Sequence, residues 1–66
     1  MKIVVNGETR MLATSLTVAL LLDELGMAGK RVAVEVNQEI VPRSRHAEFA
    51  LRDNDRVEVV VAIGGG

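Results

Sequence analysis

The sequence predicts an α+β domain, in which one helix packs across one face of a mixed sheet of four to five strands. Three observations lead to this fold class. Short β-branched runs with turn residues between them indicate strands. One segment repeats apolar residues at helical spacing, and 66 residues are enough for a single domain only. One helix and a small sheet can bury a core only by packing face to face.

The chain opens with a predicted hairpin. Residues 2–6 form a β-branched run that ends in Asn6-Gly7. Asn-Gly is the strongest short hairpin signal, because both residues tolerate the positive φ of a type I′ turn. Residues 8–12 are therefore expected to return antiparallel to the first strand.

A helix is predicted within the segment of residues 15–26. Thr17 or Ser15 can cap its first turn, and Gly26 can end it in the left-handed conformation. Its apolar stripe is made of Val18, Leu21, Leu22 and Leu25.

The second half of the chain predicts further strands. Residues 32–36 alternate between apolar and polar positions, which is typical of a half-buried strand. Residues 40–41 form a short strand that stops at Pro42, and an irregular or 3₁₀ segment follows to residue 49. Residues 57–61 are apolar at almost every position, so this last strand is expected at the centre of the sheet, parallel to the first.

Together these elements predict the β-grasp, or ubiquitin-like, arrangement. The domain is expected to span residues 1–62, followed by a flexible glycine tail at residues 63–66. The sheet residues expected to face the helix are Ile3, Val5, Leu12, Val34, Val36, Val57, Val59 and Val61.

Composition excludes several classes of protein. The chain has no cysteine, which favours a reducing compartment for so small a domain. Its formal net charge of −1, with mixed signs, does not fit a nucleic-acid-binding protein. The longest apolar run, residues 18–22, is too short to span a membrane, and no signal peptide is expected. We therefore expect a cytoplasmic protein without nucleic-acid or membrane partners.

The polar residues form no recognisable catalytic or metal-binding constellation. His46 is the single histidine and is expected to be an exposed loop residue. Residues 53–55, Asp-Asn-Asp, lack the glycine and distal glutamate of a calcium loop and are interpreted as a turn. Arg43, Arg45 and His46 form a small basic cluster, which is either a solvated loop or a contact for an anion or a partner. No enzyme activity and no metal site are predicted.

The last residues, Gly64, Gly65 and Gly66, allow two interpretations. They are either a frayed terminus or a tail whose Gly66 carboxylate is the reactive group. Such a carboxylate is ionised and inert at neutral pH, so it must first be activated, for example as an acyl-adenylate made from ATP. Residues without Cβ can thread a narrow channel, so Ile63, Gly64 and Gly65 would carry Gly66 into a partner's active site.

The chain resembles the ubiquitin-like sulfur carriers of thiamine thiazole biosynthesis, the ThiS family. The opening residues 1–7, the helix, the Asn-Gln-Glu-Ile-Val-Pro-Arg stretch at residues 37–43 and the terminal glycines carry the resemblance. It implies a carrier with no bound cofactor, rather than an enzyme. An E1-like partner would use ATP to adenylate Gly66, and a persulfide protein would supply sulfur to form a thiocarboxylate. Thiazole synthase would then accept that sulfur.

A docking surface is expected on the sheet face opposite the helix. Strand alternation places Val4, Val60 and Ala62 there, and Arg43 is a further candidate for partner contact. Two alternatives stay open: the related carrier of molybdopterin synthesis, and a β-grasp module that binds partners without covalent chemistry.

Overall fold

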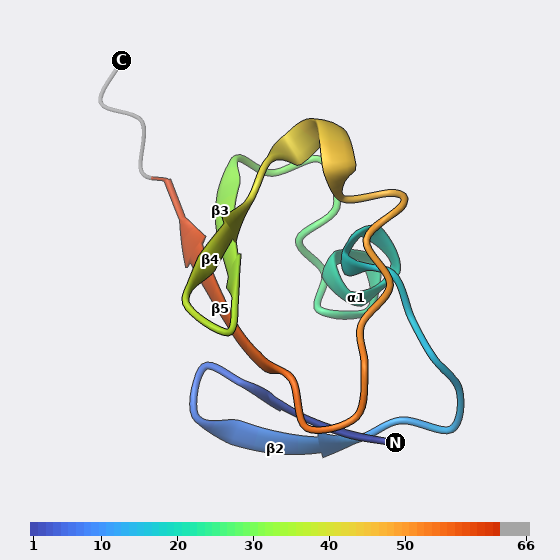
Figure 1. Ribbon diagram of the computed structural model, residues 1–66. Coiled ribbons are helices and arrows are strands. Elements are labelled where there is room, and N and C mark those ends of the chain that lie inside the picture. The colour runs from blue at the N-terminus through green and yellow to red at the C-terminus, as the bar shows by residue number, and fades with distance from the viewer. Residues whose placement is uncertain (63–66) are drawn as a thin grey trace.

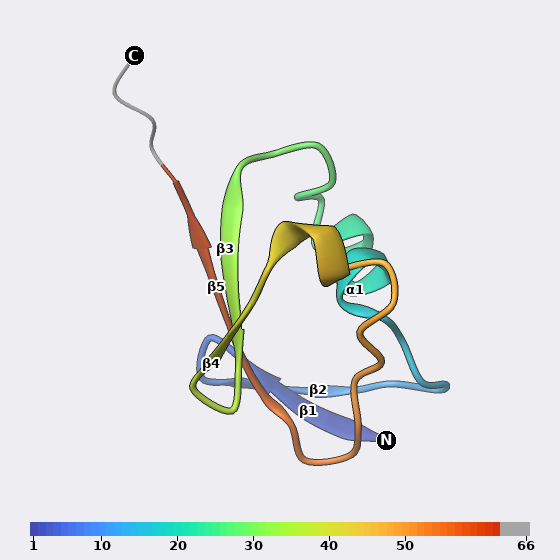
Figure 2. The same cartoon turned by 45° about the horizontal axis from the view of Figure 1, so that its top comes forward.

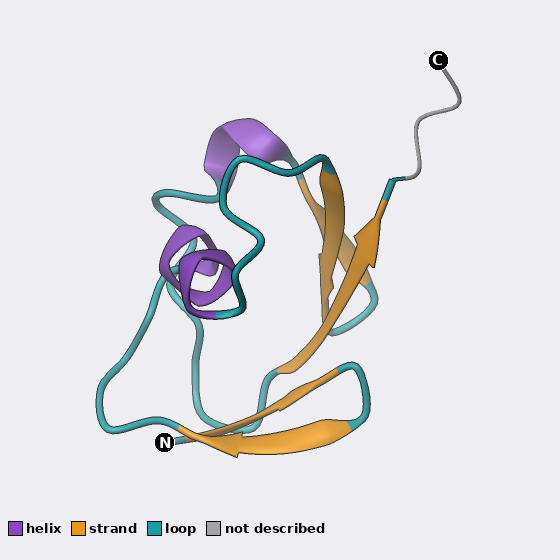
Figure 3. Ribbon diagram, turned by 180° about the vertical axis from the view of Figure 1, so that it is seen from behind, coloured by secondary structure: helices purple, strands orange, loops and turns teal. Residues whose placement is uncertain are grey.

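The fold is a five-stranded mixed sheet with one helix across one face, which confirms the predicted fold class (Figures 1 and 3). The computed structural model describes residues 1–62. Its elements are β1 (Lys2–Val5), β2 (Glu8–Met11), α1 (Val18–Glu24), β3 (Val32–Val36), β4 (Glu39–Val41), the 3₁₀ helix η1 (Arg43–Arg45) and β5 (Arg56–Val61).

The last strand lies at the centre of the sheet, as its apolar sequence predicts. The strand order is β2-β1-β5-β3-β4, with β5 parallel to β1 and antiparallel to β3. Both hairpins turn through residues of positive φ: Asn6 and Gly7 between β1 and β2, and Asn37 and Gln38 between β3 and β4. These turns fix the strand registers, and with them the face on which each side chain lies.

Helix α1 begins after Thr17, one of the two predicted caps, and both of its ends are closed by identifiable caps. The Thr17 side chain accepts a hydrogen bond from the Leu20 amide at 3.2 Å, so Thr17 is the N-cap. Ser15 instead donates to the Leu51 carbonyl. At the other end, the amides of Gly26 and Met27 donate to carbonyls of α1, and Gly26 has φ +73°. These two bonds form a Schellman cap.

The segment that follows β4 covers the start of α1. The amides of Val18 and Ala19 donate to the carbonyls of Phe49 and His46, each at 2.9 Å. These helix N–H groups have no partner within the helix itself. The irregular segment therefore holds α1 against the sheet.

The core contains most of the predicted residues, with five differences. Val61 is 43% exposed, because it occupies the last position of β5, where its neighbour Val32 is itself only half-buried. Leu12, just beyond β2, and Leu25, at the end of the helix stripe, are also only partly buried. Val41 and Leu51 are core residues that the prediction missed. The buried apolar residues are Ile3, Val5, Val18, Leu21, Leu22, Val34, Val36, Val41, Leu51, Val57 and Val59.

Candidate functional site

The end of β5 defines the candidate site, because the glycines follow it directly. The Ala62 amide donates to the Arg31 carbonyl at 2.9 Å, so the strand is held in the sheet up to this residue. Val61, one residue earlier, pairs with Val32 on β3. The predicted reactive residue Gly66 and the predicted threading residues Ile63, Gly64 and Gly65 lie outside the described residues.

Three of the predicted docking residues lie on the sheet face opposite α1, but they do not form one continuous patch, and the fourth, Arg43, lies on the helix side. Val60 is 62% exposed, Ala62 is also exposed, and Val4 is half-buried. In the β1–β5 register Val4 lies beside Arg56. Val60 is four residues further along β5, or about 13 Å away. The exposed aliphatic surface near the end of β5 therefore comprises Val60 and Ala62 without Val4.

Charged residues occupy the face between these positions. Glu58 of β5 and Glu35 of β3 are directly opposite each other in the antiparallel register. Within residues 1–62, neither carboxylate forms an ion pair. Like charges directly opposite each other on neighbouring strands repel. The Glu35–Glu58 pair therefore makes the sheet less stable than a neutral pair at the same positions would.

His46 is buried, so its predicted place on an exposed loop is wrong. Its ring is 8% exposed, and its Nε2 lies 3.1 Å from the Val41 carbonyl oxygen. A carbonyl can only accept, so Nε2 is the donor. The hydrogen bond ties the segment after η1 to the end of β4. No periodic pattern in the sequence could have indicated this contact.

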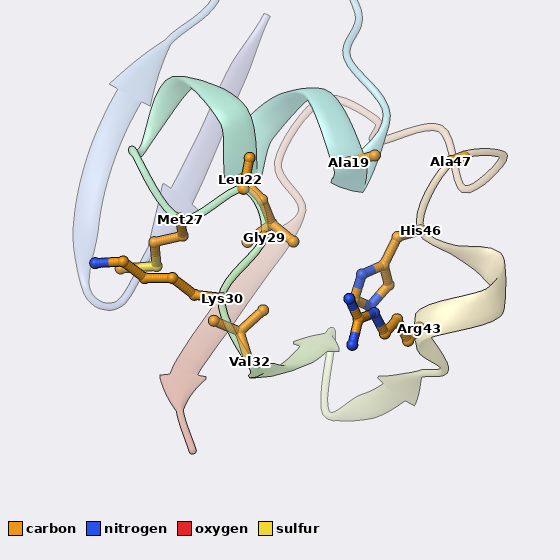
Figure 4. A pocket seen from close by; sticks show the side chains of 10 residues that line it. Ala19, Leu22, Met27, Gly29, Lys30, Val32, Arg43, His46 and Ala47 are labelled. Carbon is orange, nitrogen blue, oxygen red and sulfur yellow. The ribbon is translucent and has the colours of Figure 1, made fainter. Parts of the chain in front are cut away.

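The predicted basic cluster is divided by the structure. Arg45 lies 3.7 Å from Glu48 in an exposed ion pair. Arg43 and His46 instead point toward each other beside α1 (Figure 4). No group of three or more His, Cys, Asp or Glu side chains among the described residues is arranged to hold a metal ion.

The arrangement defines a β-grasp domain whose central strand ends beside an exposed aliphatic surface. The profile of the ThiS family matches residues 3–66, and the chain belongs to that family. The chain is 33% identical to the sulfur carrier protein ThiS of Escherichia coli, over 66 residues that cover all of both proteins. The crystal structure of the thiamine biosynthesis protein ThiS from Geobacter metallireducens superposes with a TM-score of 0.84, at 35% identity and with full coverage of both chains.

A second group of relatives is much longer than this chain. The chain is 53% identical over 66 residues to a thiazole synthase of Paramagnetospirillum magneticum. It spans only 20% of that protein, and the same fraction of a thiazole synthase from Magnetococcus marinus.

The family match confirms the predicted recognition and the interpretation as a carrier domain of the ThiS family. It also favours the thiamine carriers over the molybdopterin carrier. Within residues 1–62, no helix is both long and apolar enough to cross a bilayer. The expected cytoplasmic location stays a prediction.

Proposed function

We propose that the chain carries sulfur for thiamine biosynthesis on the carboxylate of Gly66. The observation that supports this most strongly is the family match, which extends through the glycines to residue 66. The central position of β5 adds a physical reason. Because β5 is hydrogen-bonded to β1 on one side and to β3 on the other, it stays in place while a partner binds the residues that follow it.

The proposed chemistry begins with activation. The Gly66 carboxylate attacks the α-phosphate of ATP and displaces pyrophosphate, which leaves an acyl-adenylate. The terminal sulfur of a persulfide protein then attacks the acyl carbon, and AMP departs. A second thiol cleaves the resulting acyl disulfide to give the thiocarboxylate and a disulfide. Each step is performed by partners: an E1-like adenylating enzyme, which uses the ATP, and the persulfide donor. The carrier itself holds no cofactor in this scheme.

Thiazole synthase is the proposed acceptor of the sulfur. The supporting observation is the 53% identity between this chain and a segment of a protein that is itself a thiazole synthase. A carrier domain present within the acceptor's own chain would meet it at high effective concentration.

Intact mass spectrometry tests the proposal. The chain is incubated with ATP, an adenylating enzyme of the ThiS pathway and a persulfide donor. We expect its mass to rise by the difference between sulfur and oxygen, with the change located at Gly66. Deletion of Gly66 should abolish the gain, whereas Gly66→Ala keeps the carboxylate and tests the need for a residue without Cβ. The proposal requires a free carboxylate on Gly66. The intact mass of the protein isolated from its natural source shows directly whether the chain ends at this residue.

The E. coli sulfur carrier, run in parallel with the same enzymes, is the positive control. If that carrier is converted and this chain is not, the chain is a module that binds partners without covalent chemistry.

A further inference from the structure

A pocket of about 270 Å³ opens on the helix side of the molecule, away from the sheet face described above (Figure 4). Helix α1 forms one wall, the loop after α1 a second, and η1 with the residues after it a third. The side chains that matter here are Leu22, Met27, Lys30, Val32, Arg43 and His46.

The lining combines apolar surface with positive charge. Leu22, Met27 and Val32 provide apolar contacts, and no lining residue carries a carboxylate. Arg43 and His46 line the pocket on the side of η1, while Lys30 extends past Met27 at the opposite rim (Figure 4). Within residues 1–62, the side chains of Arg43 and Lys30 form no ion pair. Both cations are therefore available to an external anion.

The walls are held in place before any partner binds. The His46 ring donates to the Val41 carbonyl at 3.1 Å, and the His46 carbonyl accepts from the Ala19 amide at 2.9 Å. These two bonds join η1 to β4 on one side and to α1 on the other. A preformed pocket binds with less loss of conformational entropy than one that must be assembled.

The pocket also lies close to the end of β5. Val32 lines it and pairs directly with Val61. The preceding residue, Arg31, accepts the hydrogen bond from Ala62. Figure 2 shows residues 27–31 at the same end of the sheet as the end of β5. A partner that takes up the residues after Ala62 comes within reach of this pocket.

We propose that the pocket receives an acidic segment of the enzyme that acts on the glycines, with one apolar side chain as its anchor. The carboxylate binds at Arg43, and the apolar side chain packs on Leu22, Met27 and Val32. Lys30, at the opposite rim, adds to the positive charge that attracts the segment. A protein segment fits better than a free anion, because most of the lining is apolar and the site adjoins the segment that the enzyme must hold. This inference rests on the proposed carrier function.

Two capped dipeptides test the chemistry without the enzyme. Acetyl-Leu-Asp-amide is titrated into the ¹⁵N-labelled full chain, with acetyl-Leu-Asn-amide as the uncharged control. We expect the acidic peptide to shift the amide signals of Lys30, Val32 and Arg43. The control should bind about tenfold more weakly, because it lacks one charged contact. Equal binding of both peptides, or equal binding of inorganic phosphate at the same residues, would overturn the proposal.

Charge reversal tests the surface with the enzymes themselves. Lys30→Glu with Arg43→Glu is compared with Arg10→Glu with Arg52→Glu, which makes the same change of charge away from the pocket. We expect affinity for the adenylating enzyme to fall about tenfold or more for the pocket pair, because like charges now face each other. The control pair should bind within about threefold of wild type. Equal losses for both pairs would show a general charge effect and overturn the proposal.

The two proposals fail in different ways. If the wild-type chain gains sulfur and the pocket pair binds and reacts equally well, the docking inference is wrong and the carrier function stands. If the peptide binds the pocket but the wild-type chain never gains sulfur, the carrier function is wrong.

Discussion

Asn6 binds the backbone of Val59 with both ends of its side-chain amide. Its Nδ2 donates to the Val59 carbonyl at 3.2 Å, and its Oδ1 accepts from the Val59 amide at 2.8 Å. β1 ends one residue earlier, at Val5, which pairs with Val57. The Asn6 side chain therefore continues the parallel ladder along β5 where the backbone of the first strand turns away.

Replacing Asn6 by alanine should destabilise the fold by about 1–3 kcal/mol, because two polar groups of a central strand lose their partners. Urea unfolding followed by circular dichroism measures the change. Thr14→Ala is the control, because Thr14 is exposed and makes no side-chain hydrogen bond within residues 1–62. A change in Asn6→Ala no larger than in that control would contradict the bridging role.

Two leucines outside the sheet should respond very differently to truncation. Leu51 is 1% exposed, so Leu51→Ala leaves a cavity and should cost about 2–5 kcal/mol. Leu20 is 51% exposed on α1, and Leu20→Ala should change stability by less than about 0.5 kcal/mol, since alanine also favours the helix. Thermal unfolding of both variants provides the comparison. Equal losses would show that Leu51 is not a core residue.

Reversing one charge of the Glu35–Glu58 pair should stabilise the sheet. Glu58→Lys converts a repulsive cross-strand pair into an attractive one, for a gain of about 0.2–1 kcal/mol. Unfolding in low and high salt measures it, and salt should reduce the gain by screening. Glu8→Lys makes the same change of charge on β2, where the opposite residue is Val5. If Glu8→Lys raises stability by the same amount, the effect comes from the change in net charge and not from the cross-strand pair.

Val60→Asp should weaken the complex with the adenylating enzyme while the domain stays folded. A carboxylate at this exposed position opposes burial against a partner, and about a tenfold loss of affinity is expected. Isothermal titration calorimetry measures the affinity, and circular dichroism checks the fold. Met11→Asp is the matched control, because Met11 is also exposed on this sheet face but belongs to the edge strand β2. Unchanged binding by Val60→Asp would remove Val60 from the docking surface.

Local sequence patterns were sufficient to predict the elements and their order. Three signals can be recognised from residues that are close together in the sequence: the Asn6-Gly7 turn, the apolar stripe of α1 and the continuous apolar run of β5. These patterns also set the alternation that placed Val60 and Ala62 on the face opposite the helix.

The contacts that the sequence did not reveal join distant residues through irregular backbone. His46 and Leu51 belong to a segment without helical or strand period, so no pattern marks them as buried. Val4 and Val60 share a face by alternation, but the distance between them depends on the register of β1 against β5. That register is set by pairing across more than fifty residues, as the Asn6–Val59 separation of 53 shows.

The central position of β5 also constrains how the molecule is made. Without residues 56–61, the strand order leaves two separate hairpins, β2-β1 and β3-β4, with nothing to join them. A hairpin on its own is marginally stable in water. During translation, the nascent chain therefore cannot complete its sheet until these six residues have left the ribosome. Residues 63–66 follow β5 almost directly, so they leave the ribosome only when the last strand is free to complete the sheet.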